Sequence, residues 1–469
     1  MQGGNRSDCR SWRLLSLALG VSRASSDADA DEICHGSARL FPRFIRGGSI
    51  MKHNIEPDKH GPLGADMANA ISKCVHCGFC LAACPTYQEL GQEADSPRGR
   101  IVLMKEVLEG GLRIENAVKH IDPCLGCLAC EPACPSGVPY RDLISPFRSI
   151  AESKRKRGLF QRIRRSVIQA TLPYPGRFFL AATVGRIFKP LAQFMPTTPR
   201  TMLDLLPEEI PRRTAWKEVY QVDEKRRARV GLLLGCAQRV LDPDINTATI
   251  SVLKRNGVEV VVPPNQSCCG ALSWHVGNID QSRKFAAQNL NAFPDDLDAI
   301  VTNAAGCGSG MHEYPLICKG TQDEQAAKKF SDRVIDVSAF LADLGDLVVP
   351  PDSGRKQKIA YHDACHLANA QGVRQPPREL LKMIPGVEVV EIHDGHLCCG
   401  SAGTYNIDQP KIAASLGRQK AEHVISTGAD VVASGNIGCL TQLRLYLEKQ
   451  DSAIQVQHTM QILRDAYAE

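Results

Sequence analysis

The chain has 469 residues, of which 19 are cysteine, 43% are hydrophobic and 23% are charged. Cysteine is too sparse for a small disulfide-stapled scaffold and too frequent for an ordinary cytosolic enzyme, so metal or redox chemistry is indicated. Lys and Arg number 56 against 51 Asp and Glu, and this mild excess argues against a dedicated nucleic-acid-binding protein. No apolar run reaches the roughly 18–20 residues that a membrane span needs. We therefore expect a multidomain α+β protein with two to four domains.

Residues 1–50 are rich in Ser, Arg and Asp and have neither helical nor strand periodicity. We interpret them as a leader that is disordered or wrongly assigned to the protein, with Met51 as a candidate start. The apolar run 14–21, which follows three arginines, weakly resembles the core of a signal peptide but lies at the short end of the usual range. Export is the alternative interpretation.

The strongest motif is a four-cysteine pattern followed by proline, and it occurs twice. This is the spacing of bacterial two-cluster ferredoxins, in which the fourth cysteine of each motif binds the other cluster. It predicts a ferredoxin domain at 51–150 that holds two [4Fe–4S] clusters. The predicted ligands are Cys74, Cys77, Cys80 and Cys134 for one cluster, and Cys124, Cys127, Cys130 and Cys84 for the other. Zinc knuckles or disulfides are disfavoured because each motif has a third cysteine and a Cys-Pro.

The stretch between the two motifs predicts a helical insertion, because residues 101–111 have helical spacing of apolar residues and end in two glycines. Arg98 and Arg100 precede this helix. They either offset cluster charge or dock a partner, or they are solvated charges at a helix cap. His76, inside the first motif, is expected to be exposed or to lie behind the ligands.

The C-terminal half repeats a set of four cysteines that includes a Cys-Cys-Gly. The sets are Cys236, Cys268, Cys269 and Cys307, and then Cys365, Cys398, Cys399 and Cys439. Cysteines follow short β-rich runs such as 230–234 and 358–361, with helical segments between, which predicts tandem α/β Cys-Cys-Gly domains at 226–345 and 355–469. Cysteines at the ends of such strands converge on one edge of the sheet.

Each set of four thiols suits zinc or a further iron–sulfur cluster about equally, and a vicinal disulfide or plain core thiols are the alternatives. Several rings accompany the sets and could serve a redox partner or protons, or could be structural hydrogen-bonding groups: His362, His366, His393 and His396 near the second set, and Trp274 and His275 after the first. The glycine-rich run 306–310 lacks dinucleotide-loop spacing and contains a repeat cysteine.

Residues 151–225 are expected to form a helical basic linker. The basic residues of this linker are Lys154, Arg155, Lys156, Arg157, Arg162, Arg164 and Arg165. Apolar residues recur among them at helical spacing, namely Leu159, Phe160, Ile163, Val167 and Ile168. Such a helix could lie on an anionic membrane surface or on a partner subunit, or it could cover its own protein with a solvated basic face.

Longer strings of sequence make the chain resemble a known family from about residue 65 to the C-terminus. These strings include Cys74-Val75-His76-Cys77-Gly78-Phe79-Cys80, Pro97-Arg98-Gly99-Arg100, His396-Leu397-Cys398-Cys399-Gly400-Ser401-Ala402-Gly403-Thr404-Tyr405 and Asn436-Ile437-Gly438-Cys439. They resemble the iron–sulfur subunits of glycolate oxidases (glycolate dehydrogenases), within a wider group that includes heterodisulfide reductases. The heterodisulfide-reductase pattern ends each repeat in Cys-x-x-Cys, which this chain lacks after Cys307 and Cys439.

The resemblance implies electron transfer, with no catalytic residue on this chain. FAD and the substrate site would lie on partner glycolate oxidase subunits that oxidise glycolate to glyoxylate, and a quinone or another acceptor would take the electrons. It also implies a cytoplasmic location, either free or peripheral on the inner face of the cytoplasmic membrane. The alternatives are the equivalent subunit of a lactate, glycerol-3-phosphate or heterodisulfide-reductase-like complex, and, in a different class, a zinc-binding scaffold without redox function.

Overall fold

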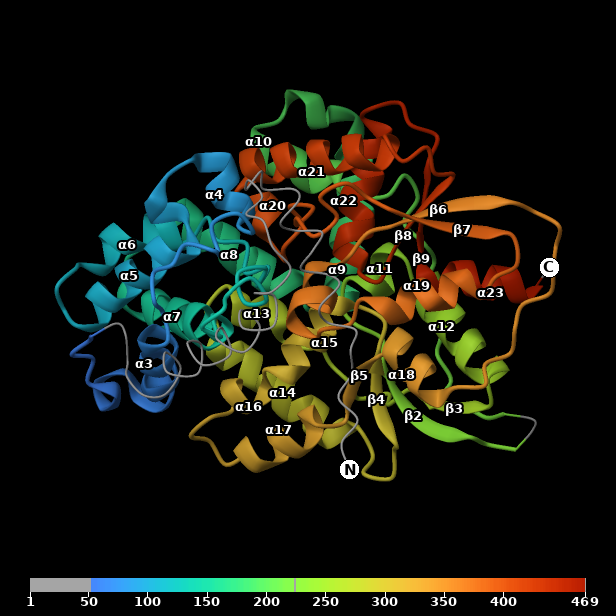
Figure 1. Cartoon of the computed structure of the whole chain (residues 1–469), viewed down its shortest axis with the longest axis horizontal. Helices are drawn as coiled ribbons and strands as arrows, with labels where there is room; N and C mark the ends of the chain where they lie inside the picture. Colours follow the sequence, from blue (N-terminus) through green and yellow to red (C-terminus); the bar gives the residue numbers. More distant parts are fainter. Residues whose placement is uncertain (1–51, 223–224, 469) are drawn as a thin grey trace, which may run out of the picture. The chain divides into compact units, whose positions relative to one another are not determined.

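The computed structural model describes residues 52–222 and 225–468 (Figure 1). The predicted leader at 1–50 and the candidate start at Met51 lie outside the described residues. Among the residues that are described, helix predominates at the N-terminal end, and two separate sheets follow it.

The N-terminal domain is helical, and its two cysteine motifs lie in irregular loops between the helices. Its elements are η1 (Pro57–Leu63), α3 (Gly64–Ser72), α4 (Pro85–Leu90), η2 (Glu93–Asp95), α5 (Pro97–Leu108), α6 (Ile114–Ile121) and α7 (Arg141–Lys154). Helix α5 begins where the sequence predicts a start, because Pro97 occupies its first position and the Ser96 side chain accepts a hydrogen bond from the Gly99 amide. The predicted helical insertion between the two motifs is confirmed.

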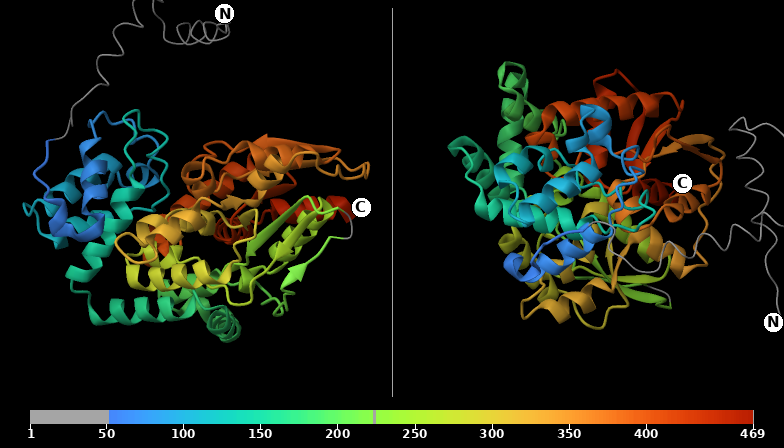
Figure 2. Two further views of the ribbon diagram at one scale, coloured as in Figure 1. Left: turned by 90° about the horizontal axis from the view of Figure 1, so that it is seen from below. Right: turned by 60° about the vertical axis from the view of Figure 1, so that its left-hand side comes forward.

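Four helical elements link this domain to the sheets: α8 (Leu159–Thr171), α9 (Pro175–Phe188), η3 (Lys189–Phe194) and α10 (Thr197–Asp204). In Figure 2 they run from the N-terminal domain along the outside of the Cys-Cys-Gly domains. Helix α9 packs on α11, and α10 packs on α20 and α21. Prolines at helix starts, such as Pro175, divide the segment into these short pieces.

The first Cys-Cys-Gly domain contains a five-stranded sheet in the order β1-β3-β2-β4-β5, in which only β1 is antiparallel to its neighbour. Its strands are β1 (Val219–Tyr220), β2 (Ala228–Leu233), β3 (Val258–Val261), β4 (Ala299–Thr302) and β5 (Val334–Asp336). Its helices are α11 (Gln238–Leu241), α12 (Asp244–Arg255), α13 (Ala271–His275), α14 (Ile279–Ala292), α15 (Ala305–His312), α16 (Tyr314–Ile317), α17 (Glu324–Ser331) and α18 (Val337–Leu344).

The second Cys-Cys-Gly domain contains a four-stranded parallel sheet in the order β7-β6-β8-β9. Its strands are β6 (Gln357–Tyr361), β7 (Val387–Glu391), β8 (Val431–Ser434) and β9 (Gln455–His458). Its helical elements are the π-helical turn η4 (His366–Ala370), α19 (Gln375–Lys382), α20 (Tyr405–Asp408), α21 (Pro410–Ile425), α22 (Ile437–Glu448) and α23 (Thr459–Ala468). The α+β architecture, a helical ferredoxin-type domain followed by two α/β repeats, is as the sequence predicts.

One hydrophobic core joins the two sheets. Helices α12, α18, α19 and α23 lie between them (Figure 1), and the core includes Val230 and Val260 of the first sheet and Ile359 and Val431 of the second. Strand β2 presents residues that are buried along most of its length, as expected for a parallel strand covered on both faces. The two repeats therefore support each other rather than standing as separate bodies.

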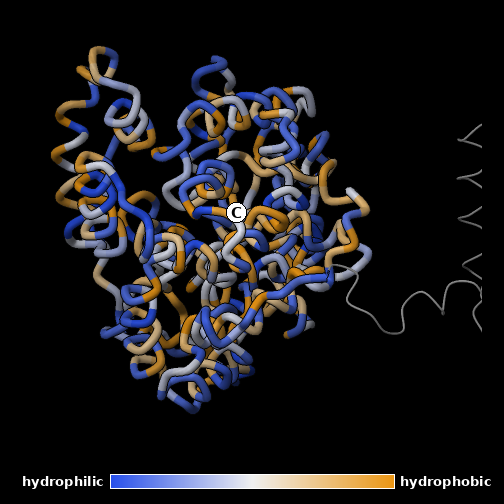
Figure 3. The backbone as a smooth tube through the Cα atoms, turned by 90° about the vertical axis from the view of Figure 1, so that its left-hand side faces the viewer, coloured by the Kyte–Doolittle hydropathy of each residue, from blue (hydrophilic) through white to orange (hydrophobic). Residues whose placement is uncertain are grey.

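No helix within 52–222 or 225–468 is long and apolar enough to cross a bilayer. The hydropathy colouring of the backbone shows why, because apolar stretches are short and alternate with polar ones (Figure 3).

Candidate metal centres

The first thiol group consists of Cys74, Cys77, Cys80 and Cys134, which line one small cavity of the N-terminal domain. Burial is the largest cause of the raised pKa of Cys74, and the nearby thiolate of Cys134 raises it further. Burial likewise raises the pKa of Cys80 to about 11. A bound cation would lower these pKa values, because thiolate is the form that binds metal.

The second thiol group consists of Cys84, Cys124, Cys127 and Cys130, which line a neighbouring cavity. Cys130 borders the first cavity as well. The fourth cysteine of each motif thus lies with the first three cysteines of the other, and the crossed ligation of two clusters by these thiols stays a prediction.

The two motif loops share a backbone conformation. In the first loop the left-handed residues are His76 and Gly78, and in the second they are Gly126 and Leu128, at matching positions after the first cysteine. Each loop therefore places one non-glycine residue in a conformation that glycine adopts more readily. His76 is exposed, as predicted, and its carbonyl accepts a hydrogen bond from Arg98 Nη1 at 2.9 Å.

Arg100 lies buried beside the second thiol group, so its interpretation as a solvated cap charge is wrong. Its guanidinium donates to the His120 carbonyl at 2.7 Å and to Thr86 Oγ1 at 2.9 Å, and Nη1 lies 3.9 Å from Cys84 Sγ. Its Nη2 is 3.7 Å from Asp95. A buried cation at this place can offset the charge of thiolates, because Coulomb interactions are strong where water is excluded.

Arg148 and Tyr140 are neighbours of the same thiols that the sequence reasoning missed. Burial opposes ionisation of Cys124, yet the guanidinium groups of Arg100 and Arg148 hold its pKa below the ordinary value. The Tyr140 hydroxyl lies 3.9 Å from Cys124 Sγ, and its side chain borders both cavities. Neither residue belongs to a motif, so only the packing of α7 on the loops identifies them.

The third thiol group consists of Cys236, Cys268, Cys269 and Cys307, at the carboxyl ends of β2, β3 and β4. Cys268 Sγ lies 3.5 Å from Cys236 Sγ, and the pKa of Cys268 is raised chiefly by this thiol contact. Cys269 has the opposite tendency, because hydrogen bonds from Cys268 and Cys307 lower its pKa. Carbonyl oxygens of the Cys-Cys pair accept hydrogen bonds from Asn289 and Tyr314, which fix the turn.

The fourth thiol group consists of Cys365, Cys398, Cys399 and Cys439, at the equivalent edge of the second sheet. Cys365 Sγ and Cys398 Sγ are 4.0 Å apart. Ligand atoms of His362, Cys399 and Cys439 lie within 4.8 Å of one another, and all three residues are buried. Burial lowers the pKa of His362 to about 3, and neither of its ring nitrogens has a hydrogen-bond partner in the described part of the chain, so a neutral imidazole is held beside these thiols.

The other rings near the two repeats differ in their surroundings. His366 Nδ1 lies 3.8 Å from Cys365 Sγ, and its ring stacks on His275 with centroids 5.3 Å apart. His393 and His396 are exposed, and His393 pairs with Asp394. Trp274 is buried and donates to Glu313. The run 306–310 lies in helix α15 and not in a loop.

The four thiol groups are connected through direct packing. Cys127 of the second group packs in one cluster with Cys365 and Cys398 of the fourth, and Asn369 Nδ2 donates to the Cys127 carbonyl at 3.1 Å. Asn436 joins the fourth group to the third, since its Nδ2 lies 3.4 Å from Cys439 Sγ and its Oδ1 accepts from the Gly306 amide at 3.3 Å.

These donor sets can be tested against the metals that the sequence implies. Each of the two N-terminal cavities is lined by cysteines, without a carboxylate, and such soft donors suit iron–sulfur clusters or zinc rather than hard cations. Two adjoining four-thiol sets with crossed membership fit a pair of [4Fe–4S] clusters, because a structural zinc site would take its four ligands from paired knuckles.

Comparison with known proteins agrees with this chemistry. Residues 70–138 match the family described as 4Fe-4S dicluster domain, and residues 230–312 and 359–444 each match the family described as cysteine-rich domain. The described residues thus carry one ferredoxin-type domain with iron–sulfur clusters and two cysteine-rich repeats.

Three curated relatives extend the likeness over most of the chain. The probable glycolate oxidase iron–sulfur subunit of Bacillus subtilis is 34% identical over 418 residues, covering 84% of this chain and 94% of that protein. The glycolate oxidase iron–sulfur subunit of Escherichia coli is 36% identical over 380 residues, covering 80% and 89%. Lactate utilization protein A of Oceanobacillus iheyensis is 31% identical over 237 residues, covering 50% and 96%. Identity at this level over nearly the whole length of the first two relatives shows that the chain belongs to the family of glycolate oxidase iron–sulfur subunits.

Proposed function

We propose that this chain is the electron-transfer subunit of a glycolate dehydrogenase complex. It would take electrons from FAD on a partner subunit, reduced as glycolate becomes glyoxylate, and deliver them to an acceptor such as a quinone. The observation that carries the proposal is the unbroken packing of four thiol groups, in the order first, second, fourth and third.

In this proposal the ligands of the two ferredoxin-type clusters are the first and second thiol groups as defined above. Such clusters supply one-electron oxidation and reduction. The chain's own residues then bury the thiols, donate hydrogen bonds to sulfur and supply the charges of Arg100 and Arg148. These are the means by which a protein adjusts a reduction potential.

The flavoprotein would dock at the first thiol group. Cys77 is the exposed cysteine of the eight ferredoxin-type residues, and Phe79 beside it is 68% exposed. An exposed aromatic residue next to an exposed ligand is typical of a docking surface, since aromatic side chains are enriched at interfaces. The thiols of the fourth group, in contrast, are all buried and reachable only through the protein.

The third and fourth thiol groups would hold thiolate-bound metal, either a further iron–sulfur cluster or zinc. The fourth group adds His362 as a neutral nitrogen donor, which suits both metals. Measurement of iron, zinc and acid-labile sulfide after anaerobic purification decides between them. About eight irons per chain fits the two ferredoxin-type clusters alone, more iron and sulfide indicates further clusters, and zinc alone would refute the electron-transfer proposal.

The linking helices would hold the complex on an anionic membrane surface. We define the apolar surface as the exposed side chains Leu159, Phe160, Ile163, Val167, Leu180, Val184, Ile187, Phe188, Leu191, Phe194 and Met202. Residues 154–203 contain eleven Lys and Arg and no Asp or Glu. Apolar side chains flanked by exposed cations match a bilayer that carries anionic lipids.

Helix α8 turns some of its arginines toward the protein and its apolar side chains outward, and this orientation supports the proposed membrane contact. One of the interpretations left open by the sequence was a helix that covers its own protein with a solvated basic face, yet Arg164 and Arg165 face the protein and Phe160 is 88% exposed. Sedimentation with vesicles of neutral and anionic lipid provides the test. We expect the full chain to bind anionic vesicles, and a Phe160→Ser, Phe194→Ser variant to bind them more weakly. Equal sedimentation of the two proteins would refute the membrane contact.

Two cysteine variants, one of a proposed ligand and one control, test the electron-transfer proposal. In the purified complex, Cys77→Ser should leave flavin reduction by glycolate intact and abolish onward transfer to an added quinone. Cys318→Ser is the matched control, because Cys318 is buried outside the four thiol groups. Unimpaired transfer with Cys77→Ser would refute the proposal. The likeness to lactate utilization protein A keeps lactate as the second candidate substrate, and flavin reduction by each acid separates the two.

A further inference from the structure

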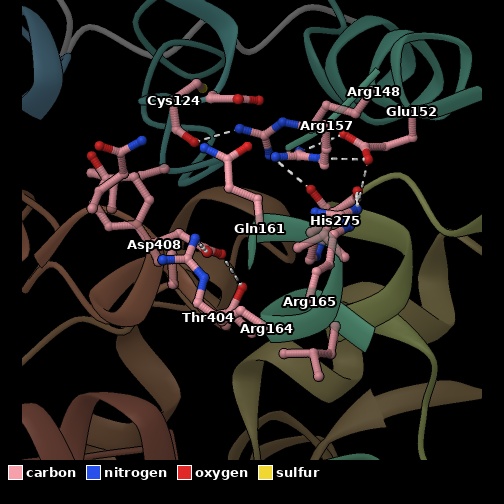
Figure 4. Close-up of a pocket in the computed structure, with 18 of the residues that line it drawn as sticks. Cys124, Arg148, Glu152, Arg157, Gln161, Arg164, Arg165, His275, Thr404 and Asp408 are labelled. Carbon is pink, nitrogen blue, oxygen red and sulfur yellow. Dashed lines mark hydrogen bonds and ion pairs between the residues drawn. The ribbon is translucent and has the colours of Figure 1, made fainter. Parts of the chain in front are cut away.

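A basic cavity of about 180 Å³ lies where α7 and α8 meet both Cys-Cys-Gly domains (Figure 4). Its volume is far above the ~15 Å³ that one water molecule needs. Its wall includes Cys124 of the second thiol group, and His366, which follows Cys365 of the fourth. The remaining wall is largely polar, with Gln161, Thr404 and Gln409 among its neutral residues.

Positive charge exceeds negative charge in this cavity. The charged lining residues are Arg148, Arg155, Arg157, Arg164 and Arg165, against Asp122, Glu152 and Asp408. The Glu152 carboxylate is shared among three of these arginines, namely Arg155, Arg157 and Arg165. Arg155 also pairs with Asp122 at 2.8 Å, so three guanidinium groups against two carboxylates leave an excess of one positive charge.

The other two arginines leave the same excess. Within the described residues, Arg148 donates to backbone carbonyls, those of His275, Ile121 and Cys124, and to no carboxylate. Arg164 pairs with Asp408 at 2.7 Å. In Figure 4 the labelled arginines enter the cavity from α7, from α8 and from the segment between them, and Thr404 and Asp408 face them from the second Cys-Cys-Gly domain.

Several buried polar atoms of the lining have no hydrogen-bond partner among residues 52–222 and 225–468. They are Arg155 Nε, Arg164 Nε, His275 Nε2 and His366 Nε2. A buried donor or acceptor without a partner costs roughly 1–3 kcal/mol, so such atoms are rarely left without one. Several of them in one cationic cavity indicate a polar, negatively charged ligand.

We infer that this cavity is a binding site for a small organic oxyanion, a carboxylate or a phosphate, held by Arg157 and Arg164. Guanidinium groups match these anions because their planar donors bind two oxygens at once. An uncharged quinone ring fits the cavity less well, since quinone sites are mostly apolar and this lining is largely charged.

Because Cys124 borders the cavity, a bound anion would act on the thiols of the second group. Negative charge beside Cys124 opposes the extra electron on any group that this thiol holds. Bound anion should therefore lower the reduction potential of the second ferredoxin-type centre. This consequence depends on the proposed electron-transfer function, whereas anion binding itself does not.

Binding is measured by titration calorimetry on the full-length, anaerobically purified protein. The probes are glyoxylate, glycolate and inorganic phosphate, with chloride as a monatomic control. We expect one saturable site that weakens with added salt, and stronger binding of the carboxylates or of phosphate identifies the source of the ligand. A site that chloride fills equally well would overturn the inference, as would the lack of saturable binding by all three oxyanions.

Two variants and a matched control locate the site. Arg157→Gln and Arg164→Gln should each weaken binding at least tenfold, whereas Arg162→Gln should leave it unchanged, because Arg162 is exposed on the helix that carries Arg164 and does not line the cavity. Circular dichroism verifies that the variants fold, and Arg157→Gln is the milder one because Glu152 keeps two other arginine partners. Redox titration monitored by electron paramagnetic resonance, with and without anion, measures the reduction potential of the second ferredoxin-type centre. Binding without a shift would refute only the coupling, and binding equal in all three variants would refute the site.

Discussion

Replacement of Arg100 by glutamine tests whether a buried cation sets the properties of the second thiol group. The side chain is 1% exposed and holds together the segments on either side of α5 through the His120 carbonyl and Thr86 Oγ1. Glutamine is shorter and neutral, so Arg100→Gln removes the charge near Cys84 and leaves Asp95 with only His120 as its ionic partner.

Two magnitudes follow from these contacts. Removing one partner of a buried ion pair destabilises a protein by about 3–5 kcal/mol. At the 3.9 Å between Arg100 Nη1 and Cys84 Sγ, two unit charges interact by about 4 kcal/mol at an effective dielectric constant of about 20. One-electron potentials change by 59 mV for each factor of ten, or about 1.4 kcal/mol, so the upper limit is about 170 mV. Charge spread over a cluster reduces this limit to several tens of millivolts.

The direction of the shift is fixed by electrostatics. Loss of a nearby positive charge disfavours the more negative, reduced state, so Arg100→Gln should lower the potential of one ferredoxin-type centre and leave the other nearly unchanged. Redox titration monitored by electron paramagnetic resonance measures the two centres, and thermal unfolding under anaerobic conditions measures stability. Arg98→Gln is the control, because Arg98 is partly exposed and bonds to Glu93 and a loop carbonyl. Unchanged potentials and stability in Arg100→Gln would refute this account of Arg100.

Three further predictions concern stability. Burial raises the pKa of Glu313 to about 7, so the folded state retains a proton that the unfolded state releases near pH 4.5. As the pH rises between these two values, the contribution of this group to the free energy of unfolding falls by at most about 3 kcal/mol. Glu313→Gln should therefore flatten the pH dependence of the unfolding midpoint. A methyl group on Gly99 would lie 2.0 Å from the Glu93 carbonyl oxygen, so Gly99→Ala should cost about 1–3 kcal/mol in chemical denaturation, whereas Gly158→Ala, with open space around it, should be neutral. Removal of iron by a chelator should expose the loops 73–84 and 122–140 to protease before the two sheets, because the loops contain no regular helix, and simultaneous cleavage of both regions would contradict this order.

Local patterns of the sequence anticipated the grouping of the cysteines. The spacing within a motif determines which thiols one short loop can bring together, and the adjoining cavities lined by Cys84 and Cys134 follow that rule. The repeat was equally predictable, since cysteines that follow parallel strands meet at one edge whatever the loops between them do. Asn436 was within reach of the sequence as well, because it begins the quoted string that ends in Cys439.

The rest depended on contacts between residues far apart in the chain. Helix α8 has the pattern of a helix that buries its apolar face, but Arg164 is drawn to Asp408, which lies 244 residues later. The sequence left Arg100 open between a charge that offsets a cluster, a docking residue and a solvated cap charge, and its contact with Cys84 distinguishes them. His393 and His396 lie within a few residues of the Cys-Cys pair, yet the turn after β7 leaves them in solvent. Periodicity and spacing contain no information on such long-range partners.

Comparison of the repeats shows that duplication produced two unequal centres. Three residues before the first cysteine of each set, the third thiol group has the apolar Leu233 and the fourth has His362. Only the fourth group packs against Cys127, within a cluster that contains Cys365 and Cys398. An imidazole nitrogen and a neighbouring ferredoxin-type thiol therefore occur on the same repeat. Ligand type and surrounding charge both set a reduction potential, so under the proposal that both groups hold iron–sulfur clusters we expect the potential of the fourth group to differ from that of the third, which would favour one direction of electron flow along the four thiol groups.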